Sequence, residues 1–188
     1  MKLVAGLGNP GDRYRRTRHN VGFEVADAVA ARHEARFEMG SEEALQARWR
    51  LEGDVVLIVK PLSFMNVSGA PVSALARYYK IDLADVLIVC DDVNLPLGRL
   101  RGRASGSEGG HNGLRSIAEA FGTTDYARLR IGVGRGDARR DLADHVLARF
   151  DAEEAGEVQA MIGRAAEAVE LWVDKGLAAM MNLYNRDV

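Results

Sequence analysis

The stretch Lys2-Leu-Val-Ala-Gly-Leu-Gly-Asn-Pro-Gly11 decides how the amino-terminal part of this chain folds. Its apolar start predicts a buried strand over residues 2–7, and the Asn-Pro-Gly at its end predicts a tight turn. His19 and Asn20 follow just before an apolar pattern of helical period that begins at Val21. An imidazole and the carboxamides of Asn9 and Asn20 therefore fall between the end of a strand and the start of a helix. In open α/β sheets, ligands bind at that edge.

The same stretch matches the G-x-G-x-x-G pattern of dinucleotide-binding proteins, with Gly6, Gly8 and Gly11 at the glycine positions. In those proteins a helix opens at the glycines, so that its amino end meets the pyrophosphate. Residues 12–18 are polar and cationic and lack apolar periodicity, so the predicted helix starts too late. This late start argues against a dinucleotide-dependent oxidoreductase. Only binding of NAD or NADP would revive that interpretation.

The composition predicts an ordinary globular protein that forms one domain, residues 1–188. The chain is 47% apolar and 28% charged, and 188 residues suffice to bury a substantial core. The single cysteine gives no internal disulfide, and no apolar run approaches the about 18 residues of a membrane span. Residues 1–30 lack the succession of basic, apolar and small residues that marks a secretory signal. We therefore expect a cytoplasmic protein that does not contact a membrane.

Predicted strands and helices alternate along the chain. Apolar spacing of helical period predicts helices over 21–35, 71–79, 114–121, 151–175 and 176–184. Short apolar or alternating runs predict strands over 2–7, 47–51, 55–59, 85–90, 100–103 and 126–133. The order indicates an α/β fold: a single domain with a mixed, mostly parallel twisted sheet covered by helices on both faces.

Arginines gather at a few places although the net charge is only -2. Arg99, Arg101 and Arg103 alternate, which places all three on one face of a strand. Arg128 and Arg130 repeat this spacing, and a further basic group lies over 13–18. Such one-sided charge favours binding of a polyanion in one orientation. The alternative is that these are solvated surface arginines that bind no ligand.

Four polar clusters follow predicted strands or open a predicted helix, at 9–20, 66–68, 91–94 and 111–112. If the strands are neighbours, these clusters meet in one crevice. Histidine exchanges protons near neutral pH, and a carboxylate on its far nitrogen fixes its tautomer and stabilises the imidazolium. Asparagine amides suit a peptide backbone or a developing oxyanion. Together these residue types predict a general base that activates water for acyl transfer.

Other chemistries find less support in the sequence. It contains neither the G-x-S-x-G turn of a serine hydrolase nor a Walker motif, and its four histidines do not stand at metal-ligand spacing. Cys90 ends an apolar strand, which is typical of a small buried residue rather than a nucleophile. Phe64 and Met65 could equally fill the core or line a pocket.

Five segments together closely resemble the bacterial peptidyl-tRNA hydrolase family, in its order and spacing. They are Gly6-Leu-Gly-Asn-Pro-Gly11, Thr17-Arg-His-Asn-Val-Gly22, Lys60-Pro-Leu-Ser-Phe-Met-Asn-Val-Ser-Gly69, Asp91-Asp-Val-Asn-Leu-Pro-Leu-Gly98 and Gly109-Gly-His-Asn-Gly-Leu114. The resemblance implies an enzyme that hydrolyses the ester between a peptide and the 3′-terminal ribose of tRNA. It would recycle tRNA from stalled or aborted translation, as a monomer, without a metal or other cofactor.

The resemblance also implies roles for particular residues. His19 would be the general base on water, Asp91 would orient and polarise it, and Asn66 would stabilise the oxyanion. The residues expected to bind the peptide and the terminal nucleotide are Asn9, Tyr14, Met65, Asn66, His111 and Asn112. The arginines expected to bind phosphates of the acceptor stem, behind the CCA end, are Arg101, Arg103 and Arg130.

The chain departs from the family pattern at Cys90, where histidine is frequent, and at Asn94, where aspartate is frequent. The second change removes a charge near the expected site. An alternative is an inactive RNA-binding protein on the same fold, similar to organellar splicing factors. Against it stands the intact set of His19, Asp91 and Asn66, which a pure binder would not need.

Overall fold

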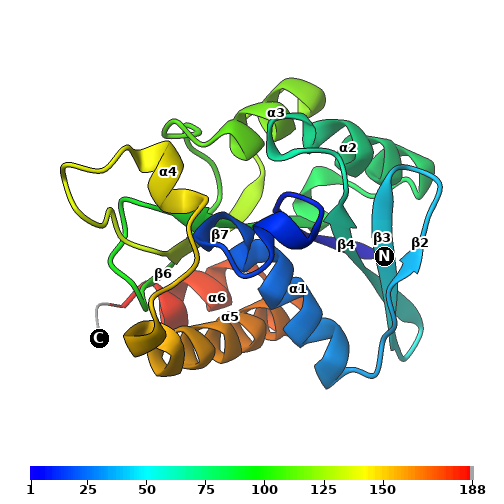
Figure 1. The fold of residues 1–188 in the computed structure, drawn as a ribbon. Helices are drawn as coiled ribbons and strands as arrows, with labels where there is room; N and C mark the ends of the chain where they lie inside the picture. The colour runs from blue at the N-terminus through cyan, green and yellow to red at the C-terminus, as the bar shows by residue number, and fades with distance from the viewer. Residues whose placement is uncertain (187–188) are drawn as a thin grey trace.

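The computed structural model describes residues 1–186, and its centre is a seven-stranded sheet with the order β2-β3-β4-β1-β5-β7-β6 (Figure 1). The strands are β1 (Lys2–Gly6), β2 (Glu38–Met39), β3 (Ala44–Leu51), β4 (Asp54–Pro61), β5 (Val86–Asp92), β6 (Leu100–Arg103) and β7 (Ala127–Gly132). The helices are α1 (Val21–Arg32), α2 (Gly69–Tyr78), α3 (Asn112–Phe121), α4 (Leu142–Val146), α5 (Ala155–Lys175) and α6 (Leu177–Tyr184). Residues 187 and 188 of the expected domain lie outside the described residues.

The centre of the sheet is parallel, and both edges are antiparallel. Strand β1 pairs in parallel with β4 on one side and with β5 on the other, and β5 pairs in parallel with β7. Strands β2 and β3 extend one edge, and β6 closes the other. The chain thus moves outward from β1 to β4 and then crosses to β5, which makes the carboxyl ends of these strands the switch point of the sheet.

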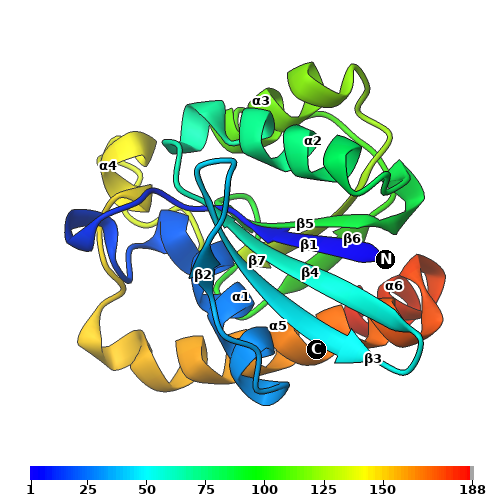
Figure 2. The ribbon, with the colours of Figure 1, turned by 90° about the vertical axis from the view of Figure 1, so that its right-hand side faces the viewer.

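Helices cover both faces of the sheet, as the sequence predicts. Figure 2 shows α2 and α3 on one side and α1, α5 and α6 on the other. Alternate residues of the central strands divide between two apolar cores: Val4, Ile58 and Leu87 face α1 and α5, whereas Leu3, Leu57 and Ile88 face α2 and α3. This period of two, with both faces buried, explains the continuous apolar run of β5.

Two glycines let α1 approach the sheet closely. A Cβ at Gly6 would lie 2.1 Å from the carbonyl oxygen of Gly22, and a Cβ at Gly22 would lie 2.5 Å from that of Val89. Side chains at either position would push the helix outward. The glycines therefore hold the start of α1, and the 3₁₀ turn Arg18–Asn20 before it, against the carboxyl ends of β1 and β5.

The structure agrees with most of the expected elements and adds two. Helix α1 begins at Val21, after the 3₁₀ turns Asp12–Tyr14 and Arg18–Asn20, so no helix opens at the glycine pattern. The segment expected to be a loop before β3 contains the two-residue strand β2, and the short helix α4 was not expected. Within residues 1–186, no helix is long and apolar enough to cross a membrane.

Candidate active site

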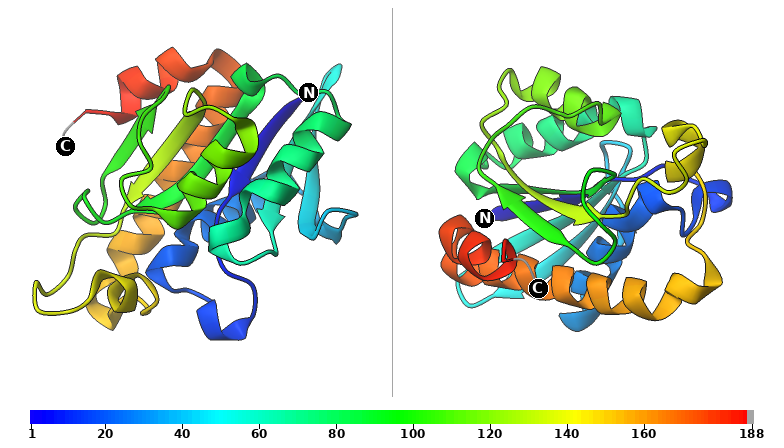
Figure 3. Two further views of the ribbon diagram at one scale, coloured as in Figure 1. Left: turned by 90° about the horizontal axis from the view of Figure 1, so that it is seen from above. Right: turned by 90° about the vertical axis from the view of Figure 1, so that its left-hand side faces the viewer.

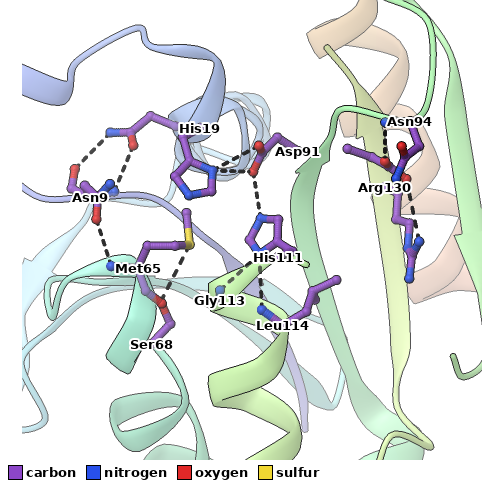
Figure 4. Close-up of polar contacts among 12 residues, drawn as sticks. Asn9, His19, Met65, Ser68, Asp91, Asn94, His111, Gly113, Leu114 and Arg130 are labelled. Carbon is purple, nitrogen blue, oxygen red and sulfur yellow. Dashed lines mark hydrogen bonds and ion pairs between the residues drawn. The ribbon is translucent and has the colours of Figure 1, made fainter. Parts of the chain in front are cut away.

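The polar clusters of the sequence meet at the switch point of the sheet. Asn9 follows β1, Met65 and Asn66 lie in the 3₁₀ turn after β4, and Asp91 is the penultimate residue of β5. With His19, His111 and Asn112 they line a cleft of about 570 Å³. Figure 4 shows Asp91 joined to both His19 and His111, with Met65 beside the two rings. The expectation that these segments converge is therefore confirmed.

Asp91 lies between the two imidazoles. Its carboxylate is 3% exposed, and both of its oxygens lie 2.9 Å from His19 Nδ1. His111 Nε2 lies 2.8 Å from Asp91 Oδ1. Burial alone would raise the pKa of Asp91, but the two adjacent imidazoles outweigh it and hold the pKa well below its ordinary value. Asp91 is therefore an anion, and both histidines must donate to it.

The same contacts fix the tautomer of each histidine. Since Nδ1 of His19 donates to Asp91, its Nε2 is left as the basic nitrogen. His111 Nδ1 accepts from the backbone N–H groups of Gly113 (3.0 Å) and Leu114 (3.2 Å), where it caps the amino end of α3. His111 Nε2 therefore carries the proton that binds Asp91. Each nitrogen that faces Asp91 is a donor, and this arrangement satisfies the buried carboxylate.

The ring of His19 is suited to accept a proton. Burial lowers its pKa, but the charge of Asp91 and the hydrogen bond to it raise the pKa more, so that the net change is upward from 6.5. This pair can take a proton from a water molecule at Nε2 and stabilise the resulting imidazolium.

Asn9 is held rigidly at the opposite side of the cleft. Its backbone N–H donates to Asn20 Oδ1 (2.8 Å), and Asn20 Nδ2 donates to its carbonyl oxygen (2.9 Å). Its side-chain Oδ1 accepts from the backbone N–H of Met65 at 2.8 Å. Asn9 therefore offers its amide N–H to a ligand. Asn66 and Asn112 are exposed at the cleft with their carboxamides open to a ligand.

Three expected site residues lie outside the cleft wall. Tyr14 packs edge-on against Phe64, a cleft residue, with 6.4 Å between the ring centroids. Arg101 pairs with Arg130 across β6 and β7, and Arg103 pairs with Arg128. Paired residues share a face, so all four arginines project from the side of the sheet that carries α2 and α3. In the left panel of Figure 3, seen from that side, no helix of residues 1–186 covers β6.

Arg128 does not belong to an open basic surface, contrary to the expectation from its spacing. Its side chain is fully buried, and its guanidinium donates to the carbonyl oxygens of Gly106, Thr124 and Tyr126. Arg130 Nη2 likewise donates to the carbonyl oxygen of Ser107 at 2.8 Å. These two arginines fasten the glycine-rich segment 104–110 to β7. Arg130 alone of the pair lines the cleft.

Two competing chemistries fit this geometry poorly. Cys90 is fully buried, and burial raises the pKa of its thiol, so it has neither the access nor the thiolate of a nucleophile. His19, Asp91 and His111 are the kinds of residue that bind metals. They bond directly to one another, however, so a metal between them would have to break the bonds that fix both rings.

One wall of the cleft was not predicted from the sequence. This wall comes from α4, and its cleft-lining residues are Leu142, Ala143, Val146 and Leu147. A helix of five residues has too few turns for a visible apolar period. The available signal was Asp141, whose side chain accepts from the backbone N–H of Ala143 and caps the helix. Asn94 also lines the cleft, and Arg135 Nη2 donates to its Oδ1 at 2.6 Å.

The fold and site define an α/β enzyme that carries a histidine–aspartate pair at the switch point of its sheet. The sequence profile of the peptidyl-tRNA hydrolase family matches residues 3–188. The chain belongs to this family.

Proteins named peptidyl-tRNA hydrolase are similar to this chain along nearly its whole length. The peptidyl-tRNA hydrolase of Nocardia farcinica is 52% identical over 96% of this chain and 94% of its own, and that of Symbiobacterium thermophilum is 47% identical over 98% of each. The crystal structure of peptidyl-tRNA hydrolase from Acinetobacter baumannii superposes with a TM-score of 0.91 at 32% identity. It covers 98% of this chain and 94% of that one.

We predict that His111→Phe moves the acidic limb of the pH–rate profile for ester hydrolysis to higher pH. The phenyl ring takes the place of the imidazole and excludes water. Asp91 loses one hydrogen-bond donor, however, so its charge acts more strongly on His19. The pKa of His19 then rises, and the base becomes neutral only at higher pH. Loss of the cap on α3 should lower the free energy of unfolding by about 1 kcal/mol.

The control for this measurement is His33→Phe, at the carboxyl end of α1. His33 stacks on Trp49 and contacts Glu170, outside the cleft. Its replacement should leave the acidic limb in place. If the acidic limb in His111→Phe keeps its position or moves to lower pH, His111 does not act on Asp91.

Proposed function

We propose that this cleft hydrolyses the ester between the peptide and the 3′-terminal ribose of peptidyl-tRNA and returns the tRNA to translation. The contact between Asp91 and the Nδ1 of His19 carries the proposal, because it leaves the Nε2 of His19 basic beside exposed carboxamides. Membership of the family and relatives named peptidyl-tRNA hydrolase support the choice of substrate. The comparisons do not support the alternative of an inactive RNA-binding protein.

The reaction needs one water molecule and forms no covalent bond between the enzyme and the peptide. His19 Nε2 removes a proton from water as the oxygen attacks the ester carbonyl, and Asp91 stabilises the imidazolium. The carbonyl becomes a tetrahedral oxyanion that accepts a hydrogen bond from Asn66. When the intermediate collapses, the bond to the ribose oxygen breaks, and His19 returns its proton to that oxygen. An ester has a good leaving group, so internal peptide amides should survive.

The carboxamides also suggest how the substrate is chosen. Asn9 and Asn112 would bind the peptide main chain and the terminal nucleotide, where peptidyl-tRNA presents a neutral amide. Aminoacyl-tRNA presents a cationic amine at the same place, and the carboxamides would be imperfectly paired with it. Unpaired polar groups in a closed site are costly, which is the basis of strong discrimination.

The tRNA would approach over the open face of β6. Arg130 lies at the rim of the cleft, and Arg101 pairs with it across the strands, with Arg103 two residues further along. We assign the acceptor stem to this row and the CCA end to the cleft. By resemblance to the family, the proposal is for a monomer that would act in the cytoplasm.

The direct test is release of N-acetyl-aminoacyl groups from tRNA, compared with release of unblocked aminoacyl groups. The wild-type protein should act on the blocked substrate much faster. His19→Gln should lower the chemical rate by roughly 10²–10⁴-fold without changing the unfolding transition, because water loses its general base. Near-normal turnover by this variant would remove His19 from the proposed role. Equal rates on both substrates would remove the proposed basis of discrimination.

We predict that Arg103→Ala weakens tRNA binding and lowers its dependence on salt. Each phosphate contact releases counterions, so loss of one should reduce the slope of log K against log salt by roughly 0.7–0.9. Arg77→Ala, on the exposed side of α2, is the matched control and should leave the slope unchanged. A slope that is the same in Arg103→Ala and the wild type would move the phosphate site away from β6.

A further inference from the structure

Helix α4 depends on contacts with other parts of the chain. It has five residues, Leu142–Val146, and a helix this short is not stable by itself in water. Leu142 and Leu147 are partly exposed where they line the cleft, so this wall buries little apolar surface of its own. Among the helices and strands of residues 1–186, α4 contacts mainly the 3₁₀ turn Arg18–Asn20.

Arg18 is the residue of that turn that holds α4. Its Nη1 donates to the carbonyl oxygens of Arg149 (2.8 Å), Ala148 (3.3 Å) and His145 (3.4 Å). Its Nη2 lies 3.2 Å from Glu154 Oε1, and its backbone N–H donates to the carbonyl oxygen of Ala148 at 3.0 Å. One side chain therefore binds the end of α4 and the start of the next helical segment.

Two of the partners of Arg18, His145 and Glu154, lie at helix ends, and the other two, Ala148 and Arg149, lie in the segment between them. The carbonyl oxygen of His145 belongs to the last turn of α4, where a cation is favourable. Glu154 forms a capping box with Asp151 ahead of α5, and its Oε1 also accepts from the backbone N–H of Asp151. Only a guanidinium spreads its donors widely enough to bind all of these acceptors at once, since the ammonium of lysine is a single point charge.

Arg18 is not available to a phosphate. It is 4% exposed, and the ring of Phe150 lies 5.3 Å from its guanidinium carbon. The basic group over 13–18 of the sequence therefore contains one residue that points inward. Because His19 is the next residue in the chain, the same turn presents the histidine to Asp91 and the arginine to α4.

We propose that Arg18 is a positioning residue that sets the distance of the α4 wall from His19, and that this wall holds the acyl group of the substrate. The proposal rests on the proposed function for the nature of the substrate. Leu142, Val146 and Leu147 line the same cleft as Phe64 and Met65, and these apolar side chains would enclose the side chain next to the ester. Loss of Arg18 would let α4 move outward and leave His19 and Asp91 paired.

The test compares Arg18→Lys and Arg18→Met with the wild type on N-acetyl-aminoacyl-tRNA. Because the wall binds substrate and the base remains, KM should rise by about 10- to 100-fold in both variants, with a smaller change in kcat. The acidic limb of the pH–rate profile should not move. The lysine variant keeps the charge, so a phosphate contact would survive in it. Arg77→Met is the control for removal of an arginine from a helix surface.

Hydrogen exchange gives a second measurement that needs no substrate. The amides of residues 142–149 should exchange faster in both Arg18 variants, whereas those of α5 beyond its first turn should be unchanged. An unchanged KM in both Arg18 variants would overturn the proposal, and so would unchanged exchange of the amides of residues 142–149. So would a KM that rises only in Arg18→Met together with a reduced salt slope, which would indicate a phosphate contact.

The two proposals fail in different ways. If the wild-type protein does not hydrolyse the blocked substrate, the proposed function fails. Hydrogen exchange would still show whether Arg18 holds α4. If the wild type is active and the two variants keep its KM, only the role of Arg18 is rejected.

Discussion

The carboxylate of Asp91, buried between two imidazoles at the end of β5, is the interaction on which the site depends. A buried charge is costly unless donors surround it, and here His19 and His111 supply them. In return, the carboxylate fixes the tautomer of both rings and raises the pKa of His19. His111 also caps α3, so the same contact joins the active site to a helix end. Stability and reactivity are therefore linked at this point.

Contacts in the surrounding fold hold these groups in position. The close approach of Gly6 and Gly22 fixes the turn that carries His19, and Asn20 holds Asn9 by its backbone. Arg18 connects the same turn to the wall formed by α4. Close packing and hydrogen bonds thus join the segments that carry Asn9, His19 and α4.

Much of this arrangement could be predicted from the sequence because it follows from local periodicity and one topological rule. Continuous apolar runs identified the central strands, and the polar residues after them were expected to meet at one sheet edge if those strands were neighbours. The inward turn of Arg128 and Arg18 could not be predicted, because an arginine spacing does not show whether carbonyl oxygens or solvent will surround the guanidinium. Helix α4 was missed because its stability comes from distant residues rather than from its own pattern.

The central claim is that neutral His19 carries its proton on Nδ1 and offers Nε2 to water. It can be tested most directly by ¹⁵N NMR of the imidazole across a pH titration, in the wild type and in Asp91→Asn. The account predicts the Nδ1-protonated tautomer in the wild type, with a pKa above 6.5 that falls when the carboxylate is removed. A proton on Nε2, or a pKa that does not respond to Asp91→Asn, would contradict it.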